Sequence, residues 1–142
     1  QPRGVELSNR ILEKIKKITN NQNLHSGSLD ITFFRDDFGR RECPIEAQEL
    51  DMNVSIEDKK VVLIDDVLFT GRSIRAAMDA LMSFGRPNQV ELLVLIDRRY
   101  KREIPIQANY CGAKIDTFKG DKVNVVWNEN SKKDVIYIEN NG

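Results

Sequence analysis

Residues 61–73 decide the fold, and they read Val-Val-Leu-Ile-Asp-Asp-Val-Leu-Phe-Thr-Gly-Arg-Ser. The four consecutive apolar residues from Val61 to Ile64 predict a strand that is buried on both faces. Two carboxylates, Asp65 and Asp66, follow at the carboxyl end of this strand. A short turn then leads into a helix that we expect to begin at Ser73, which would cap it. The stretch therefore predicts a strand, turn and helix of an α/β sheet.

This unit offers groups for both halves of a sugar phosphate. Backbone N–H groups at the start of a helix lack partners, the helix dipole favours an anion, and the hydroxyls of Thr70 and Ser73 can donate to phosphate. Neighbouring side chains on a strand diverge, so Asp65 and Asp66 can accept from two ribose hydroxyls or hold magnesium through water. We therefore expect a sugar-phosphate site here.

The stretch also admits two other interpretations. An acid pair after an apolar strand is also typical of phosphoacceptor receiver domains, and a Thr-Gly before a helix can be a cap and nothing more. A receiver needs a third Asp after a later strand and a Lys further on. Asp97 does end a later strand, but Arg98 and Arg99 follow it, which a receiver loop does not favour. The complete string in this order favours the sugar-phosphate site.

Composition indicates one compact domain spanning residues 1–142, with 40% hydrophobic and 31% charged residues. No apolar run approaches the length of a membrane span, and no signal peptide is visible. Cys43 and Cys111 lack metal-ligand spacing and are most simply reduced, which favours the cytoplasm. His25 is the only histidine, which excludes a histidine-based catalytic triad. The 22 basic residues balance 22 acidic ones, so overall charge gives no sign of a nucleic-acid binder.

Helical periodicity predicts helices at 5–19 and 73–84. The first helix would place on the sheet an apolar stripe made of Leu7, Ile11, Leu12, Ile15 and Ile18. The second would bury a stripe made of Ile74, Ala77, Met78 and Leu81. We expect further strands at 28–35, 90–96, 110–115, 122–127 and 135–139. The strand, helix and strand from 61 to 96 form a parallel crossover, and ligands bind beyond the carboxyl ends of such strands.

Three charged segments each admit two interpretations. Arg3 and Gly4 form either a second anion loop at a helix start or a solvated turn. The irregular stretch from Arg35 to Ser55 is either a flexible arm that folds over substrate or a solvated insertion. Residues 98–102, with four cations around Tyr100, are either an RNA-binding surface or a solvated loop.

The central string resembles the phosphoribosyl pyrophosphate (PRPP) signature of type I phosphoribosyltransferases. Together with Gly-Arg-Pro at 85–87, Leu-Val-Leu-Ile-Asp-Arg at 93–98, Glu-Ile-Pro-Ile at 103–106 and Ala-Asn-Tyr-Cys-Gly at 108–112, the chain resembles the PyrR family. This family combines pyrimidine-operon attenuation with uracil phosphoribosyltransferase activity. The resemblance implies a mainly parallel central sheet flanked by helices, with a small hood and a long flexible loop. It also implies that a helix and a first strand precede Gln1.

The resemblance assigns roles by position. Asp65 and Asp66 would hold the ribose of PRPP and Arg35 would close on its pyrophosphate, and these three are the implied catalytic residues. The 5-phosphate would bind Leu68, Thr70, Gly71, Arg72 and Ser73. Pyrophosphate would also meet Arg3 and Gly4, whereas the base would lie near Asp97, Arg98 and Ile104. Magnesium is the implied cofactor, bound through PRPP rather than by a protein cage.

Other features bear on the base and on partners. Purine-specific relatives carry an acid just before the Thr-Gly, and Phe69 in that place favours a pyrimidine. Arg99 stands where the family commonly has Gly, and the loop after it is one residue longer. Candidates for RNA contact are Arg99, Lys101 and Arg102, but Gln107 and Ala113 replace basic residues expected of an RNA-binding surface.

Three functions follow as hypotheses. The first is an enzyme that converts uracil and PRPP to UMP and diphosphate. The second is a nucleotide-sensing regulator that binds a messenger RNA leader with little catalysis. The third is a phosphoribosyltransferase for another base. The family resemblance further implies a homodimer or larger assembly, and no membrane partner.

Overall fold

The computed structural model describes residues 2–35, 54–118, 120–128 and 133–140. The predicted arm between Arg35 and Ser55 falls almost wholly outside these ranges. In chain order the elements are helix α1 (Pro2–Thr19), the 3-10 turn η1 (Thr32–Phe34), strand β1 (Lys60–Leu68), helix α2 (Arg72–Met82), and strands β2 (Gln89–Arg99), β3 (Tyr110–Asp116), β4 (Lys122–Val126) and β5 (Val135–Glu139).

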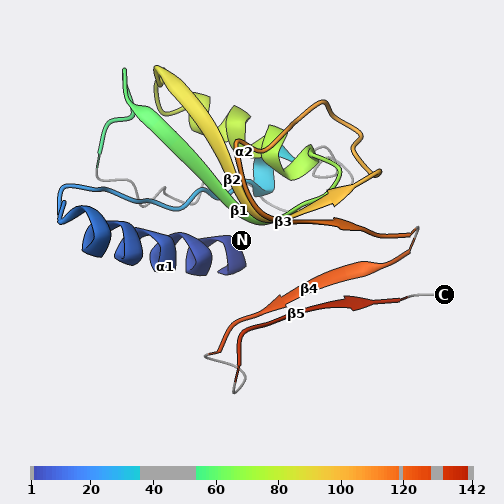
Figure 1. Cartoon of the computed structure of the whole chain (residues 1–142). Coiled ribbons are helices and arrows are strands. Elements are labelled where there is room, and N and C mark those ends of the chain that lie inside the picture. Colours follow the sequence, from blue (N-terminus) through green and yellow to red (C-terminus); the bar gives the residue numbers. More distant parts are fainter. Residues whose placement is uncertain (1, 36–53, 119, 129–132, 141–142) are drawn as a thin grey trace.

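The first three strands form a parallel sheet in the order β1-β2-β3 (Figure 1). Strand β2 returns after α2, as the predicted crossover requires, and the α/β class is confirmed. The register pairs Leu63 with Leu92 and Leu68 with Asp97. The carboxyl ends of β1 and β2 therefore share one edge of the sheet, where the acids of both strands collect.

Helices cover both faces of this sheet (Figure 1). On one face, Ile74 of α2 joins Leu68, Leu92 and Val94 in the buried core. On the other, α1 packs against β1. Because burying apolar surface is the main stabilising term, these contacts fix α1 and α2 around the end of β1.

The predicted apolar stripes are only partly correct. In α1, Leu7 is buried, but Ile15 and Ile18 are exposed. In α2, Met78 is exposed and Ala76 and Ala80 are buried instead. The buried face of α2 is therefore made of Ile74, Ala76, Ala77, Ala80 and Leu81, and the periodicity did not single out two of its alanines.

Strand β1 is the outer strand of the described sheet, and its predicted burial on both faces is wrong. Val62 is 46% exposed. Beside it runs a largely apolar groove of about 910 Å³ between α1, β1 and α2, which reaches Gly4, Asp65 and Ser73. The groove leaves one edge of β1 open, whereas β2 has a neighbouring strand along each edge.

The predicted strand at 28–35 does not form. Only Ser28 makes a bridge, and η1 follows at Thr32–Phe34. The cause is local: the Asp30 carboxylate accepts hydrogen bonds from the Thr32 N–H at 2.9 Å and from its hydroxyl at 2.6 Å. These bonds lower the pKa of Asp30 and turn the chain, so they override the alternating pattern.

The last two strands form a separate antiparallel hairpin, β4-β5 (Figure 1). Arg10 joins it to α1 by stacking 4.6 Å from the centroid of the Trp127 ring and by an ion pair with Asp134 at 2.9 Å. Across the described residues, no helix combines the length and the hydropathy needed to traverse a bilayer.

Candidate functional site

The two acids lie within β1, three and two residues before its end at Leu68. The predicted strand ended at Ile64, but hydrogen bonding continues through Leu68. Asp65 pairs in register with Val94. Both acids lie near the start of α1, since Gly4 approaches Asp65 Oδ1 and Arg3 approaches Asp66 Oδ2. The divergence of the two carboxylates toward separate ribose hydroxyls stays a prediction.

Each carboxylate is held by the backbone that follows it. Asp65 Oδ1 accepts the N–H of Asp66 at 2.9 Å, and Asp66 Oδ1 accepts the N–H of Val67 at 3.0 Å. Burial, and then the neighbouring charge of Asp66, raise the pKa of Asp65 to about 7. A group that favours its protonated form so strongly gains from a ligand that supplies positive charge or a hydroxyl donor.

The start of α1 faces these acids. A guanidinium nitrogen of Arg3 lies 4.0 Å from Asp66 Oδ2. Gly4 lies so close to β1 that a Cβ there would stand 3.3 Å from Asp65 Oδ1. The predicted loop or turn at Arg3 and Gly4 is wrong, because both residues belong to the first turn of α1. The helix start brings a half-exposed cation to the acid pair, and the role of Arg3 and Gly4 toward an anion stays a prediction.

The turn after β1 ends at Gly71, which is the N-cap of α2 with a φ of 93°. The predicted cap at Ser73 is wrong because the helix begins one residue earlier, at Arg72. Thr70 Oγ1 accepts the Arg72 N–H at 3.3 Å. The Leu68 side chain is buried in the core, so only its backbone faces the turn. The helix start nevertheless lies directly beyond the acids, where the sequence predicted the phosphate.

The three residues predicted near the base lie in or just after β2. Arg98 is buried, its guanidinium stacks 3.8 Å from the Phe69 ring centroid, and it donates to Thr117 Oγ1 at 3.0 Å. Burial lowers the pKa of Arg98, and the charge of Asp121 opposes that shift. The side chain of Arg98 is thus committed to protein partners, which leaves its backbone for a ligand.

Asp97 and Ile104 are tied to the turn. The Asp97 carboxylate accepts from Arg102, which also donates to the carbonyl of Phe69. The Ile104 N–H donates to the Thr70 carbonyl at 3.1 Å. The structure therefore brings the predicted base residues against the predicted phosphate turn.

The three candidates for RNA contact are in different settings. Arg99 is an exposed residue that forms two hydrogen bonds with Asp116, at 2.7 and 2.8 Å. This interaction raises the pKa of Arg99. Lys101 is partly exposed, whereas Arg102 points inward to Asp97. Sequence reasoning missed the inward role of Arg102, since its place among four cations indicated a surface.

Arg35 directly follows η1, which lies against α2. It is exposed at the edge of the described range, so its predicted role toward pyrophosphate stays a prediction. In the described ranges, no three of His, Cys, Asp and Glu gather as a metal cage. The carboxylates of Asp65 and Asp66 are hard oxygen ligands, which suits magnesium that arrives with phosphates and keeps most of its waters.

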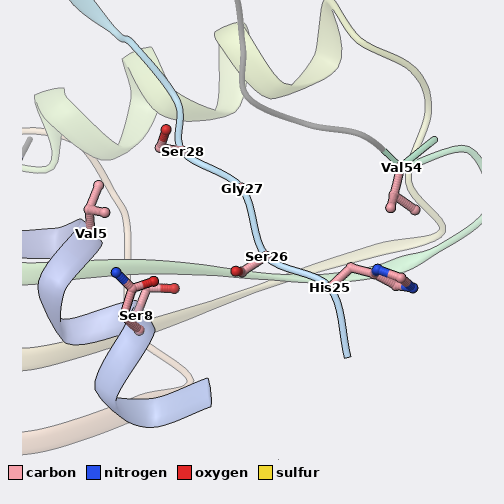
Figure 2. A pocket seen from close by; sticks show the side chains of 8 residues that line it. Val5, Ser8, His25, Ser26, Gly27, Ser28 and Val54 are labelled. Atoms are coloured by element: carbon pink, nitrogen blue, oxygen red, sulfur yellow. The ribbon is translucent and has the colours of Figure 1, made fainter. Parts of the chain in front are cut away.

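A smaller cavity of about 380 Å³ lies between α1 and the segment around His25, and most of its lining residues also line the groove beside β1 (Figure 2). Figure 2 shows Val5 and Ser8 of α1 on one side and Ser26 and His25 on the other. Its lining contains hydroxyl groups and an imidazole but no carboxylate, so it lacks the acids that the sugar-phosphate chemistry uses.

Comparison with known proteins shows the family to which the chain belongs. The sequence model of the family described as "Phosphoribosyl transferase domain" matches residues 3–130, so the chain belongs to the phosphoribosyltransferase family. A "Bifunctional protein PyrR" from Desulfosudis oleivorans is 45% identical over 136 residues, covering 96% of this chain and 75% of the relative. One from Bacillus subtilis is 43% identical over 141 residues, covering 98% and 77%. Within the phosphoribosyltransferases, the chain is thus a member of the PyrR family.

Among solved structures, a hypoxanthine phosphoribosyltransferase from Staphylococcus aureus overlaps 49% of this chain and 36% of its own. The sequence identity is 34% and the TM-score is 0.43.

Proposed function

We propose that this chain is a uracil phosphoribosyltransferase, which converts uracil and PRPP to UMP and diphosphate. One observation carries the proposal: the acid pair of β1, the cation of Arg3 and the glycine-capped start of α2 meet at one edge of the sheet. A ribose, a pyrophosphate and a 5-phosphate require these three kinds of group in this order.

The chemistry needs no protein nucleophile. The bond from ribose C1 to the pyrophosphate oxygen breaks, a bond from uracil N1 to C1 forms, and the N1 proton is lost. Asp65 and Asp66 would accept the two ribose hydroxyls and fix C1, while the N–H groups at residues 70–73 would hold the 5-phosphate. Arg3 would lie beside the leaving pyrophosphate, where its charge favours departure.

Magnesium is part of this proposal. Bound to PRPP, it would neutralise charge on the departing diphosphate. Asp65 and Asp66 are the residues that would hold it, directly or through water, and the raised pKa of Asp65 fits a carboxyl group that a cation would help to ionise.

Phe69 supports a pyrimidine as the base. Its ring is fixed against Arg98, so the turn places an aromatic surface where an acid would be needed to exchange a proton with a purine. A transferase for another base stays the alternative. Measuring PRPP consumption with uracil, orotate, hypoxanthine and adenine tests it, and the proposal expects turnover with uracil to exceed the others.

Asp66→Asn tests the acid pair itself. The neutral amide accepts a hydrogen bond from a hydroxyl more weakly than a carboxylate does. We therefore expect kcat with uracil to fall about a hundredfold, which is the usual effect of losing a charge-assisted interaction in a transition state. Asp79→Asn, on the exposed side of α2, is the matched control and keeps its activity. Turnover of Asp66→Asn equal to that of the wild type would contradict the assignment.

The relatives are named bifunctional, and membership of the PyrR family favours RNA binding as a second activity of this chain. Arg99, Tyr100 and Lys101 form an accessible cluster at the end of β2 that could contact a leader transcript. Residence in the cytoplasm, with PRPP, uracil and messenger RNA, belongs to the same proposal.

A further inference from the structure

The segment after β2 is fastened to the phosphate turn along its backbone. The N–H groups of Glu103 and Ile104 both donate to the carbonyl of Thr70, at 2.9 and 3.1 Å. A Cβ at Gly71 would stand 3.2 Å from the Ile104 carbonyl oxygen. The Glu103 carboxylate also pairs with Arg72 at 2.6 Å. The turn that would bind phosphate and the loop that would bind the base thus touch at consecutive residues.

Arg102 adds a side-chain bridge to this contact. One guanidinium nitrogen donates to the Phe69 carbonyl and another to the Asp97 carboxylate. The side chains of Arg102 and Asp97 are 23% and 11% exposed, against 48% and 52% for Arg99 and Asp116 nearby. An enclosed pair is screened far less by water, so the Arg102 bridge is the stronger constraint of the two.

The path of the chain brings Arg102 into this place. Arg99 continues β2, and Tyr100 then adopts a φ of 69°, a left-handed conformation that reverses the chain. Position 99, where a glycine was expected, is therefore ordinary strand, and the strained turn falls one residue later. This one-residue shift returns Arg102 to Asp97, five residues before it.

We infer that Arg102 is a positioning residue, which holds the Phe69–Thr70 turn against the base loop so that phosphate and base sites keep one spacing. The inference rests on the proposed function. The hydrogen bonds of Arg102 described above go to protein groups. Arg102 acts through the carbonyl of Phe69 and the carboxylate of Asp97, and its planar fork suits two acceptors that diverge.

The test compares Arg102→Ala and Arg102→Lys with the wild type. We expect Arg102→Ala to weaken equilibrium binding of magnesium PRPP, measured by calorimetry, about tenfold, which is the scale of one lost charge-assisted hydrogen bond. The KM for PRPP should rise by a similar factor and the KM for uracil should rise with it. Arg102→Lys restores charge but reaches one acceptor, so its affinity should fall between the two.

Arg86→Ala is the control, because Arg86 is an exposed arginine beyond α2. Arg102→Ala leaves the buried Asp97 carboxylate without its cation, so its unfolding midpoint should fall. Thermal unfolding without ligand therefore serves to confirm that all four proteins are folded at the assay temperature, which separates positioning from a loss of fold. PRPP affinity and both KM values of Arg102→Ala equal to those of the wild type would overturn the inference alone. A wild-type chain that binds no PRPP would overturn the proposed function and the inference with it.

A double substitution supplies an independent check that does not depend on turnover. If Arg102 acts through Asp97, Asp97→Asn and Arg102→Ala together should weaken PRPP binding no more than the more severe single change. If the losses of PRPP affinity in the two single variants multiply in the double variant, the two side chains act separately. That result would overturn the proposed bridge.

Discussion

Asp65 and Asp66 show how differently two neighbouring carboxylates can be placed. Asp66 is 5% exposed and faces Arg3, which compensates its burial. Burial and the neighbouring charge of Asp66 raise the pKa of Asp65 to about 7. Ionising the Asp65 carboxyl group, which would hold a sugar hydroxyl, thus costs free energy until a ligand binds.

The pH dependence of stability tests this difference. The pKa of Asp65 is 3.8 in the unfolded reference and about 7 in the fold, so the protein holds the proton more tightly when folded. Stability from this group is complete below pH 4 and is lost as the pH rises through 7. Asp65→Asn removes the titrating carboxyl group, and with it the loss of stability at high pH. We expect its unfolding midpoint to exceed that of the wild type at pH 8 by about 5 °C.

At pH 4 the two proteins should unfold at nearly the same temperature, measured without magnesium or PRPP by circular dichroism. Asp79→Asn, an exposed carboxylate on α2, is the control and should show no gain that grows with pH. A constant difference between Asp65→Asn and the wild type across this range would contradict the assigned burial cost.

At the scale of the element, the β1–α2 unit depends on how the helix begins. Gly71 takes the left-handed φ that ends the turn, and the base loop packs on it too closely for a side chain. The absence of a side-chain cap at the helix start leaves its N–H groups for a phosphate, apart from that of Arg72, which Thr70 accepts.

Gly71→Ala therefore combines strain with displacement. We expect it to destabilise the fold by about 1–2 kcal/mol, the usual cost of a non-glycine residue held at positive φ. It should also weaken PRPP binding, because the new methyl group pushes the turn away from Ile104. Chemical denaturation and calorimetry measure the two effects.

Gly85→Ala separates these effects. Gly85 lies beyond the other end of α2 with a φ of 148°, and its added Cβ would meet Glu57 rather than the site. It should lower stability and leave PRPP affinity unchanged. Equal affinities for the Gly71→Ala and wild-type proteins would show that the turn tolerates displacement.

At the scale of the molecule, charge is balanced but its distribution is not. The chain carries 22 basic and 22 acidic residues, while Arg99 and Lys101 lie on an accessible loop around Tyr100, which is 78% exposed. Arg99 forms an ion pair with Asp116, which reduces the charge and the hydrogen-bond donors that it can present to RNA. The loop is a small basic surface beside the site rather than a basic face.

Binding of a pyrimidine-operon leader transcript should accordingly be weak and sensitive to salt. We expect Arg99→Ala with Lys101→Ala to reduce affinity and to flatten its salt dependence by about two phosphate contacts. Filter binding at several salt concentrations measures both, and Arg86→Ala is the control. Absence of binding at low salt would reject the RNA-binding half of the proposal.

Much of this architecture could be predicted from local pattern. The apolar runs predicted β1, β2, β3, β4 and β5 and the parallel crossover, because strand burial leaves a direct record in the residues. The family resemblance was confirmed because the decisive motif is one continuous string. The wrong predictions concern features that depend on the surrounding structure. The predicted strand at 28–35 does not form because the chain turns at Asp30. The burial of Val62 was predicted wrongly because burial depends on which elements lie alongside.

By itself, then, the sequence determined the class of the sheet, the family and the positions of the acids and the phosphate turn, since each is encoded by neighbouring residues. Only the tertiary structure decided what those groups touch. It brought Arg3 to Asp66, stacked Arg98 on Phe69 and turned Arg102 from the surface into the site. These pairs lie far apart in the chain, and their meeting is fixed by packing and register, which no local pattern contains.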